Sequence, residues 1–585
     1  MKKLFITVIL VLVAFNSLYG KELDSWKDQV LYFVLIDRFY DGNRDNCKNV
    51  DKKNLLAFHG GDIAGLEQKL DYLNELGITG IWVSPFLQNR EDAFYGQEAY
   101  HGYWPYDFFS VDKRFGTEEE LVSFRNKLKK MNMRLVLDMV VNHMGYDAPF
   151  VDEHKDWFNP MINIENWNDP VELKERCIFG LPDFASQKKE VRDFFGKVSE
   201  HWINILHPEA FRLDAVKHVN DEFWSDFNSN ARKLSDNGFM ILGEYLHGDP
   251  AEVKKTWENA GFDSLFDFPL YYTMKEVFAQ DSNCKKLASR LYFDRYYPDA
   301  WMLATLLDNH DLDRFITSCK GNIDRYKLAM AFLMTVRGIP TLCYGDEQPL
   351  RGYHGSLPHN RCDMKFTTRS DMFKFTRELI ALRKNNIALR RGLHCHLYAD
   401  KNLYAFCRLT EDQLAIVVFN NSDEQQQLDV DFPFDIQNSV YVQDPVCGDA
   451  NARATITCGK LKTTLAAKSF AVYIPNSISH FYSKPYNDWK NRFEDEMAWG
   501  ERPVTIKLIF EKAPSNADFF VTGNCDELGN WNIEKSVKMR HIAGNNYEAT
   551  VNMPVGKIFE YKGFYRQGKK TVWQNGENNI DIVRK

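Results

Sequence analysis

LVLDMVV (Leu135–Val141) leads directly into Asn142-His143 and gives the clearest indication of how this chain folds. AFRLDAV (Ala210–Val216), followed by Lys217-His218, repeats its pattern of an apolar run that ends in polar side chains. A short, continuous apolar run is typical of a strand that is buried on both faces, as in a parallel sheet. The two stretches therefore predict parallel strands whose carboxyl ends carry the functional side chains.

Six further runs of the same kind extend the pattern, and amphipathic helical stretches alternate with them. The further runs are Val30–Ile36, Ile78–Val83, Phe239–Glu244, Phe262–Phe268, Trp301–Asp311 and Ile339–Gly345. The helical stretches include Gly65–Leu76, Thr117–Lys130, Lys188–Leu206, Asp221–Leu234 and Arg325–Val336. Regular alternation of eight buried strands with helices predicts an α/β fold, a (β/α)8 TIM barrel, over residues 21–390.

The rest of the chain is predicted to form smaller domains. The gap of about 144–187 after the third strand is too long for a structureless loop, so we expect a small inserted domain there. After a helix at Phe373–Asn385 the pattern becomes that of antiparallel strands, which predicts a β-domain over 391–478. A polar linker is expected at 479–502 and a last β-sandwich domain at 503–585.

The charge of the chain indicates which class of partner it is not expected to bind. Lys+Arg is 73 and Asp+Glu is 81, the net charge is −8, and no block of like charge stands out, which argues against a nucleic-acid partner.

Lys2 and Lys3 precede an apolar run, Leu4–Phe15, that is too short to span a bilayer. Residues 1–20 therefore read as a signal peptide, and we expect an exported protein (secreted, periplasmic or surface-associated) that is monomeric and has no membrane span. The count of 11 Cys is odd, so at least one thiol stays unpaired, and the pairing of the others is open.

Three carboxylates follow predicted strands and would meet at one mouth of the barrel. Asp214 ends the fourth strand, Glu244 the fifth and Asp311 the seventh. Glycosidic cleavage requires a nucleophile and an acid/base, and a third carboxylate can hold sugar hydroxyls. A single acid would more often be a structural ion-pair partner. Three of them at strand ends, each beside His or Arg, favour a catalytic site.

Four segments carry a resemblance to a known family. DMVVNH (Asp138–His143), FRLDAVKH (Phe211–His218), GEY (Gly243–Tyr245) and LDNHD (Leu307–Asp311) resemble the signature segments of the α-amylase family of glycoside hydrolases, glycoside hydrolase family 13. AYHGYWPYD (Ala99–Asp107) is similar to the corresponding segment of secreted fungal-type α-amylases. The resemblance implies endo-hydrolysis of α-1,4-glucosidic bonds in starch, glycogen and maltooligosaccharides with retention of configuration.

The resemblance also implies roles for individual residues. Asp214 matches the nucleophile, Glu244 the general acid/base and Asp311 the third carboxylate, while Arg212 would hold Asp214 ionised. The residues that match sugar-binding positions are His101, Tyr103, Trp104, His143, Lys217, His218 and His310. The polar loop Gly345–Arg361 matches the family's outer sugar-binding segment only in part, and Asn360 and Arg361 receive no role.

A structural calcium ion is a further implication of the resemblance. Asn142, Asp183 in LPDFA (Leu181–Ala185) and the backbone carbonyl of His218 match its ligands, and Glu175 is a candidate for the remaining one. Oxygen ligands of this kind suit a hard cation. The insert contains only Cys177, so it can form no internal disulfide.

The last domain resembles a starch-binding module, carbohydrate-binding module family 20. The matching segments are GNCDELGNW (Gly523–Trp531), FEYKGF (Phe559–Phe564) and VWQNGENN (Val572–Asn579). Trp531 and Trp573 match its sugar-stacking pair, and Lys562 and Asn578 match the residues that bind glucose hydroxyls.

Two other functions stay open at this point. A glucanotransferase, either cyclodextrin-forming or disproportionating, would use the same three carboxylates and replace water with a sugar hydroxyl. Cyclising relatives usually carry another β-domain before the starch-binding module, where this chain has only Ser479–Arg502. A non-catalytic starch-binding surface protein would be expected to lack a carboxylate, and all three are present.

Overall fold

The computed structural model describes residues 22–434, 439–447, 453–474, 482–498, 500–511, 514 and 516–583. The chain forms two compact units. The first contains the residues up to Gln280 together with Tyr297–Arg391, and the second contains Asp281–Tyr296 and Gly392 onward. The predicted signal peptide, residues 1–20, lies outside the described residues.

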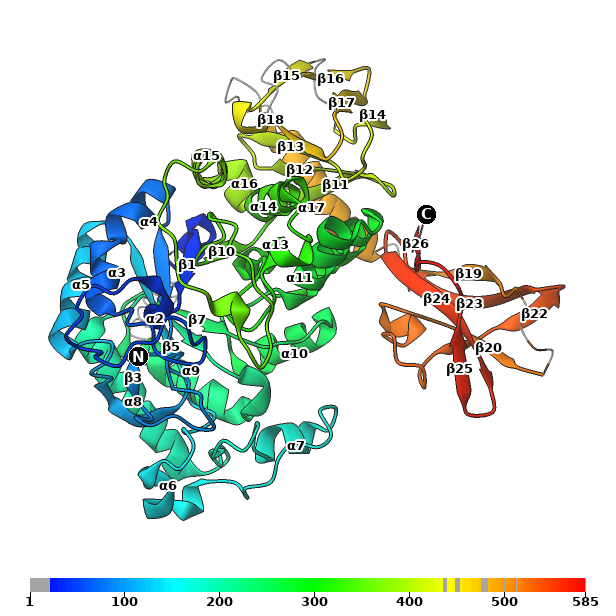
Figure 1. The fold of residues 1–585 in the computed structure, drawn as a ribbon. Coiled ribbons are helices and arrows are strands. Elements are labelled where there is room, and N and C mark those ends of the chain that lie inside the picture. Colours follow the sequence, from blue (N-terminus) through cyan, green and yellow to red (C-terminus); the bar gives the residue numbers. More distant parts are fainter. Residues whose placement is uncertain are drawn as a thin grey trace, which may run out of the picture. The chain divides into compact units, whose positions relative to one another are not determined.

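The first unit is built around eight parallel strands (Figure 1). They are β1 (Leu31–Val34), β2 (Gly80–Val83), β5 (Arg134–Met139), β6 (Ala210–Leu213), β7 (Met240–Gly243), β8 (Ser264–Leu265), β9 (Ala304–Leu306) and β10 (Ile339–Cys343). Their order is β8-β7-β6-β5-β2-β1-β10-β9, and a parallel bridge between Phe266 and Ala304 links the two ends of the sheet. The predicted (β/α)8 barrel is confirmed, and all eight predicted strands overlap the observed ones.

Helices surround the barrel where the apolar periodicity predicted them. They include α3 (Ile63–Gln68), α4 (Leu70–Leu76), α5 (Glu118–Lys130), α8 (Lys189–Leu206), α9 (Asp221–Leu234), α10 (Pro250–Ala260), α14 (Ile323–Thr335) and α15 (Asp371–Asn385). The helix predicted at Gly65–Leu76 is interrupted at Lys69, and α10 was not among the predicted helices.

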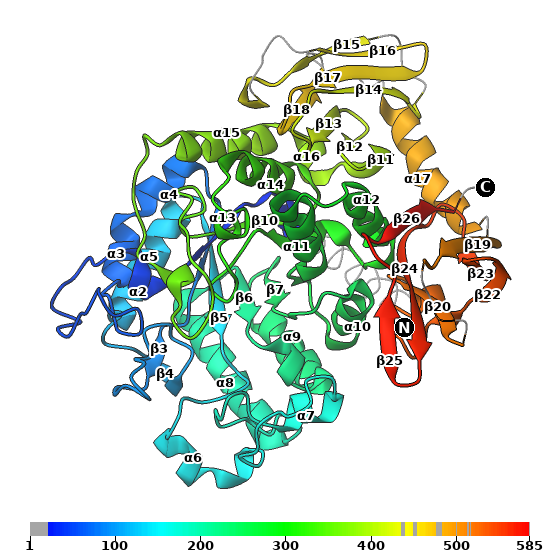
Figure 2. The same ribbon diagram turned by 45° about the vertical axis from the view of Figure 1, so that its right-hand side comes forward.

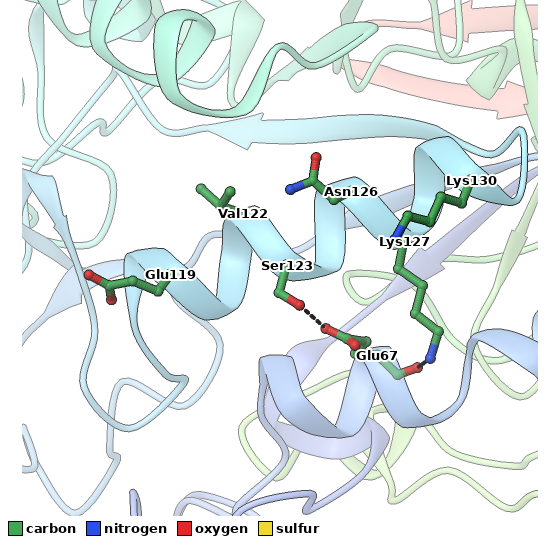
Figure 3. A pocket seen from close by; sticks show the side chains of 7 residues that line it. All are labelled: Glu67, Glu119, Val122, Ser123, Asn126, Lys127 and Lys130. Atoms are coloured by element: carbon green, nitrogen blue, oxygen red, sulfur yellow. Dashed lines mark hydrogen bonds between the residues drawn. The ribbon is translucent and has the colours of Figure 1, made fainter.

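Local contacts place these helices. Thr117 and Glu120 form a reciprocal capping box that starts α5. Figure 3 shows the polar groove between α3 and α5, where Ser123 Oγ donates to Glu67 Oε2 at 3.0 Å. Lys127 Nζ donates to the Glu67 carbonyl, also at 3.0 Å. These bonds tie two barrel helices together, and none of the predicted site residues lines this groove.

The segment after β5 leaves the barrel and returns. It contains α6 (Pro149–Glu153) and α7 (Pro170–Glu175), which project beyond the ring of barrel helices in Figures 1 and 2. An antiparallel bridge between His143 and Asp183 joins the beginning and the end of this segment at the barrel mouth. A short hairpin of β3 (Leu87–Asn89) and β4 (Pro105–Val111) precedes it in the chain.

The second unit contains two β-domains. One is an eight-stranded sheet of order β11-β12-β13-β18-β15-β16-β17-β14, with antiparallel pairing between neighbours. The strands are β11 (Leu393–Ala399), β12 (Leu403–Leu409), β13 (Leu414–Asn420), β14 (Gln426–Asp431), β15 (Ser439–Gln443), β16 (Arg453–Thr457), β17 (Lys460–Leu465) and β18 (Ser469–Ile474). The predicted antiparallel character of this region is confirmed.

The last domain has two antiparallel sheets around one apolar core, as predicted. One sheet contains β19 (Glu501–Ile509), β22 (Arg540–Ala543) and β23 (Asn546–Pro554). The other contains β20 (Asp518–Gly523), β21 (Val537–Lys538), β24 (Ile558–Gln567), β25 (Lys570–Trp573) and β26 (Asn579–Ile582), with β24 at its centre.

The connection between the two β-domains differs from the prediction. Within the predicted linker 479–502, helix α17 spans Ser483–Ala498. Tyr482 and Trp489 are buried in the core of the eight-stranded domain, and the Trp489 ring lies 5.7 Å from that of Phe434. The predicted polar linker therefore contains a helix that packs on the eight-stranded domain. Its polar composition hid a helical spacing of aromatic residues that bury one face of α17.

A second difference concerns Asp281–Tyr296, which the sequence assigned to the barrel. It contains α12 (Lys285–Tyr292) and belongs to the same compact unit as the two β-domains. Across the described ranges, the structure has no helix of the length and apolar character that a bilayer crossing requires.

Candidate active site

The predicted catalytic residues meet at the carboxyl ends of the barrel strands. Asp138 lies near the end of β5, Asp214 directly follows β6, Glu244 directly follows β7, and Asp311 comes five residues after β9. The backbone turns sharply after β6, because Ala215 adopts a left-handed conformation with φ 52°. This turn directs the Ala215 N–H to Glu244 Oε2 at 3.1 Å, so the ends of two neighbouring strands are joined through the carboxyl of Glu244.

Arg212 lies at the centre of the site and contacts three carboxyls. Its Nη1 is 2.8 Å from Asp138 Oδ1 and 2.7 Å from Asp214 Oδ1, and its Nη2 is 3.3 Å from Glu244 Oε2. The guanidinium is fully buried. Removing a cation from water is costly, and this arrangement offsets the cost with charge-assisted contacts. Arg212 thus holds the two predicted catalytic carboxyls on one fixed group.

The surroundings of Glu244 shift its pKa away from that of an ordinary glutamate. Burial raises the pKa of Glu244 to about 8, and the negative charges of Asp214 and Asp311 add to the rise. Arg212 and the Ala215 N–H act in the opposite direction but do not cancel it. Glu244 therefore holds its proton at neutral pH, which is the state that a general acid requires.

Asp311 has the opposite character. Burial by itself would raise its pKa, but His310, Arg361 and Arg212 outweigh that effect and hold the pKa below its usual value. Arg361 Nη2 is 2.8 Å from Asp311 Oδ1, and His310 Nε2 is 3.1 Å from Oδ2. At neutral pH Asp311 is therefore ionised while Glu244 carries its proton.

Arg361 is a site residue to which the sequence analysis gave no role. Its Nε donates to the His310 carbonyl at 2.9 Å, and Asn360 Nδ2 donates to the same carbonyl at 2.7 Å. Both residues lie in the polar loop after β10, far from Asp311 in the chain. The partial match of this loop to the family's outer sugar-binding segment was a sequence signal, but it did not indicate which carboxylate Arg361 contacts.

Aromatic and histidine side chains line the same mouth. The Tyr103 ring stacks on His310 with centroids 5.0 Å apart, and its hydroxyl donates to Asp138 Oδ2 at 2.9 Å. His143 Nε2 lies 3.0 Å from the Tyr103 carbonyl, and His101 Nδ1 accepts from the Tyr103 N–H at 3.0 Å. Burial lowers the pKa of His143, His310 and His101, so all three are neutral at pH 7 and can donate or accept hydrogen bonds.

The remaining predicted sugar-binding residues lie around this cluster. Trp104 is buried and packs edge-on against His101, with ring centroids 4.8 Å apart. His218 Nδ1 lies 3.0 Å from the Leu173 carbonyl of α7, and burial lowers its pKa to about 4. Burial also lowers the pKa of Lys217, which directly precedes His218.

Part of the predicted calcium site comes together beside the barrel mouth. Asp183 is buried, and its Oδ2 accepts from Asn159 Nδ2 at 2.8 Å, with Asn142 as a second amide partner. Burial raises the pKa of Asp183 well above its usual value. Asn159 was not predicted, because an isolated Asn in a polar insert carries no signal. The described residues contain no cluster of three His, Cys, Asp or Glu side chains that could hold a metal, so the oxygen donors here are amides and a single carboxylate.

Glu175 does not join this group. It is exposed at the end of α7, and within the described residues no hydrogen bond or ion pair connects it with Asp183. The structure thus gives no support to Glu175 as a ligand.

The four predicted residues of the starch-binding module lie around β24. Lys562 is on β24. Trp573 of β25 pairs with Phe564 of the same strand. Asn578 directly precedes Asn579, which pairs with Tyr561 of β24. Trp573 is 41% exposed. The Trp531 N–H donates to the Gly523 carbonyl at 2.7 Å. Gly523 is the last residue of β20 and pairs with Tyr561 of β24.

The backbone that presents Trp531 is strained. Asn530 and Trp531 both have left-handed φ angles, 50° and 61°, directly after Gly529 at 81°. Such conformations are unfavourable for bulky residues and tend to persist at binding sites. Lys562 Nζ donates to the Gly576 carbonyl at 2.6 Å, which holds the loop before Asn578.

Comparisons with known proteins agree with this geometry. The family model "Alpha amylase, catalytic domain" matches residues 33–365, and the model "Starch binding domain" matches residues 501–584. A beta/alpha-amylase from Paenibacillus polymyxa is 32% identical over 77% of this chain. The matched region spans only 38% of the length of that protein. A cyclomaltodextrin glucanotransferase from Klebsiella oxytoca is 26% identical over 95% of the chain and 92% of its own length. The crystal structure of an Anoxybacillus α-amylase superposes with a TM-score of 0.72 at 32% identity, covering 77% of this chain and 99% of the other.

The protonation of Glu244 leads to a testable pH dependence. We expect kcat/KM on a soluble maltooligosaccharide to fall as the pH rises through about 8, because the acid that must donate a proton then loses it. Glu244→Gln should lose nearly all activity at every pH. Glu222→Gln, at an exposed position on α9, is the control and should keep the profile of the parent enzyme. A basic limb near 4.5, the ordinary value for Glu, would contradict the assignment.

Proposed function

Because the chain belongs to the α-amylase family of glycoside hydrolases, we propose that it is an endo-acting α-amylase that cleaves α-1,4-glucosidic bonds with retention of configuration. Starch, glycogen and maltooligosaccharides would be its substrates. The observation that carries this proposal is the shared contact of Asp214 and Glu244 with the buried Arg212 guanidinium at the barrel mouth.

In the first step Asp214 attacks the anomeric carbon while Glu244 donates its proton to the departing glycosidic oxygen. One carbon–oxygen bond forms to Asp214 and one breaks to the leaving chain. In the second step Glu244, now ionised, removes a proton from water, and the resulting hydroxyl displaces Asp214. Glu244 is reprotonated and Asp214 is ionised again, so the cycle closes.

The surrounding residues position the sugar at the point of cleavage. Asp311, kept ionised by Arg361 and His310, would accept hydrogen bonds from sugar hydroxyls. Tyr103, fixed by its stacking on His310, would offer its ring to the sugar face, and neutral His143 would bind a hydroxyl. Lys217 and His218 would contact the next sugar along the chain.

A glucanotransferase remains the second candidate, since the similarity to the Klebsiella oxytoca glucanotransferase extends over 95% of the chain. Transfer differs from hydrolysis only in the acceptor of the second step. Between Ile474 of β18 and Glu501 of β19, the described residues are Tyr482, helix α17 and Gly500, and this short connection favours hydrolysis over cyclisation.

The stereochemistry of the first product tests the proposed roles. Proton NMR during hydrolysis of a maltooligosaccharide should show the α-anomer first, because two displacements at one carbon restore its configuration. Asp214→Asn should abolish turnover, since an amide cannot form the ester intermediate. Early β-product would exclude Asp214 as a nucleophile, and cyclic products from soluble starch would favour the transferase.

We further propose that Asn142, Asp183 and the His218 carbonyl hold a structural calcium ion. Asp183 is a buried carboxylate that has no ion-pair partner among the described residues, and amides surround it. A hard cation with oxygen ligands would satisfy this charge and would link the insert to the barrel. Asn159 is a fourth candidate ligand in place of Glu175.

Chelation should reveal this ion as a stabilising ligand. A ligand that binds only the folded state stabilises it by about 2.7 kcal/mol at a hundredfold excess over its Kd. EDTA should therefore lower the melting temperature of the parent protein and have little effect on Asp183→Ala. Asp152→Ala, which removes an exposed acid of the same insert, should respond to EDTA like the parent. A melting temperature that EDTA leaves unchanged would exclude the site.

The last domain is proposed to bind starch through Trp531 and Trp573, with Lys562 and Asn578 contacting hydroxyls. Trp531→Ala together with Trp573→Ala should cut binding to raw granules and hydrolysis of them by at least about tenfold. Hydrolysis of a short soluble maltooligosaccharide should stay nearly unchanged. Ile542→Ala, which changes an exposed apolar residue of the same domain, is the control. An equal loss on both substrates would show that the tryptophans are structural.

Export is the remaining proposal. A signal peptide at residues 1–20 would be removed on secretion, and the mature N-terminus would then lie close to Lys21. N-terminal sequencing of protein recovered outside the cytoplasm tests this directly.

A further inference from the structure

The segment Asp281–Tyr296 lies between β8 and β9 in the chain but packs with the C-terminal domains. Two contacts hold it to the eight-stranded domain. The Cys284 N–H donates to the Lys401 carbonyl at 3.1 Å, and Lys468 Nζ is 2.6 Å from Asp281 Oδ1. The beginning of α12 is thus anchored before the helix reaches the starch-binding domain.

The face of α12 that follows makes buried polar contacts with the starch-binding domain. Ser289 is 1% exposed, and its hydroxyl donates to the Ile558 carbonyl of β24 at 3.3 Å. The same hydroxyl accepts from Asn524 Nδ2 at 3.0 Å. Asn524 Oδ1 in turn accepts from the Glu560 N–H at 2.8 Å. Buried polar groups that satisfy one another in this way belong to an ordered interface, because each would be costly if left unpaired.

Apolar contact accompanies these bonds. Phe293, directly after α12, packs against the apolar core of the starch-binding domain. The interface therefore has an apolar part and a polar part, both supplied by one short segment.

A charged contact connects this interface with the starch-binding residues. Lys286 Nζ on α12 lies 3.5 Å from Glu560 Oε1, and both side chains are mostly buried. The same carboxylate oxygen accepts from Asn578 Nδ2 at 2.5 Å. Lys286 and Asn578 thus contact the same oxygen of Glu560.

We propose that α12 is a built-in docking surface for the starch-binding domain and that Lys286 is a positioning residue for its glucan site, acting through Glu560 on Asn578. The second part rests on the proposed starch-binding role of Asn578. Docking by α12 and burial of α17 on the eight-stranded domain together replace a flexible tether with a fixed attachment. Glucan binding and docking are then linked, so each favours the other.

Ligand-free hydrogen–deuterium exchange of the full-length protein tests the docking surface. Ser289→Arg places a long charged side chain in the buried contact, and we expect faster exchange in both α12 and Ile558–Gln567 of β24. Lys285→Ala, one residue before Lys286, is the control and should exchange like the parent. If β24 keeps its protection in Ser289→Arg while α12 loses it, the two surfaces do not dock.

Binding of β-cyclodextrin to the full-length protein, measured by calorimetry, tests the positioning role. Lys286→Ala and Glu560→Gln should each weaken binding by about fivefold, and the double variant should be no weaker than either, because both break one pathway. Lys286→Arg should restore most of the affinity, and Lys285→Ala should bind like the parent. Unchanged affinity in Lys286→Ala would overturn the positioning role.

The same measurements separate this proposal from the assignment of the starch site. If the Trp531→Ala and Trp573→Ala variants bind β-cyclodextrin as the parent does, the proposed starch site itself is wrong. The exchange experiment uses no ligand, so its result on α12 and β24 stands in either case.

Discussion

The buried guanidinium of Arg212 is the contact on which the active site depends. It touches Asp138, Asp214 and Glu244, which come from three neighbouring strands, and it compensates the negative charge of the ionised carboxylates among them in a region sheltered from water. Removing one partner of a buried pair commonly costs 3–5 kcal/mol, because the other charge is left uncompensated. The barrel brings the ends of the strands together, and the positive charge of Arg212 stabilises the buried acids at this position.

The proposed chemistry depends on the different pKa values that the site gives to its carboxylic acids. Glu244 is buried and near two other acids, so its pKa rises to about 8. Asp311 is flanked by His310 and Arg361, which keep its pKa below the ordinary value. Two carboxylic acids that interact electrostatically thereby have different protonation states at neutral pH, which is how a site can hold a proton donor together with an ionised acid.

The C-terminal unit shows how a binding domain can be held without a flexible connection. Trp489 of α17 is buried on the eight-stranded domain, and Ser289 of α12 is buried against the starch-binding domain. Both contacts remove conformational freedom, and the buried apolar and hydrogen-bonded groups offset that loss. A fixed attachment presents the strained loop at Trp531 and the exposed ring of Trp573 in a defined direction within this unit.

The apolar runs of the sequence were enough to predict the barrel and its eight strands, and the polar residues at their ends predicted that Asp214, Glu244 and Asp311 share one mouth. Buried parallel strands appear in a sequence as short apolar runs that few polar residues follow. It also indicated the family and the starch-binding module through short local motifs. The folded structure was needed to identify contacts between residues distant in the chain, namely Arg361 with Asp311, Asn159 with Asp183, and Lys286 with Glu560. Periodicity also missed α17, since a polar composition concealed its few buried aromatic residues. Local pattern encodes which face of an element is buried, whereas pairing across long loops depends on the folded path of the backbone.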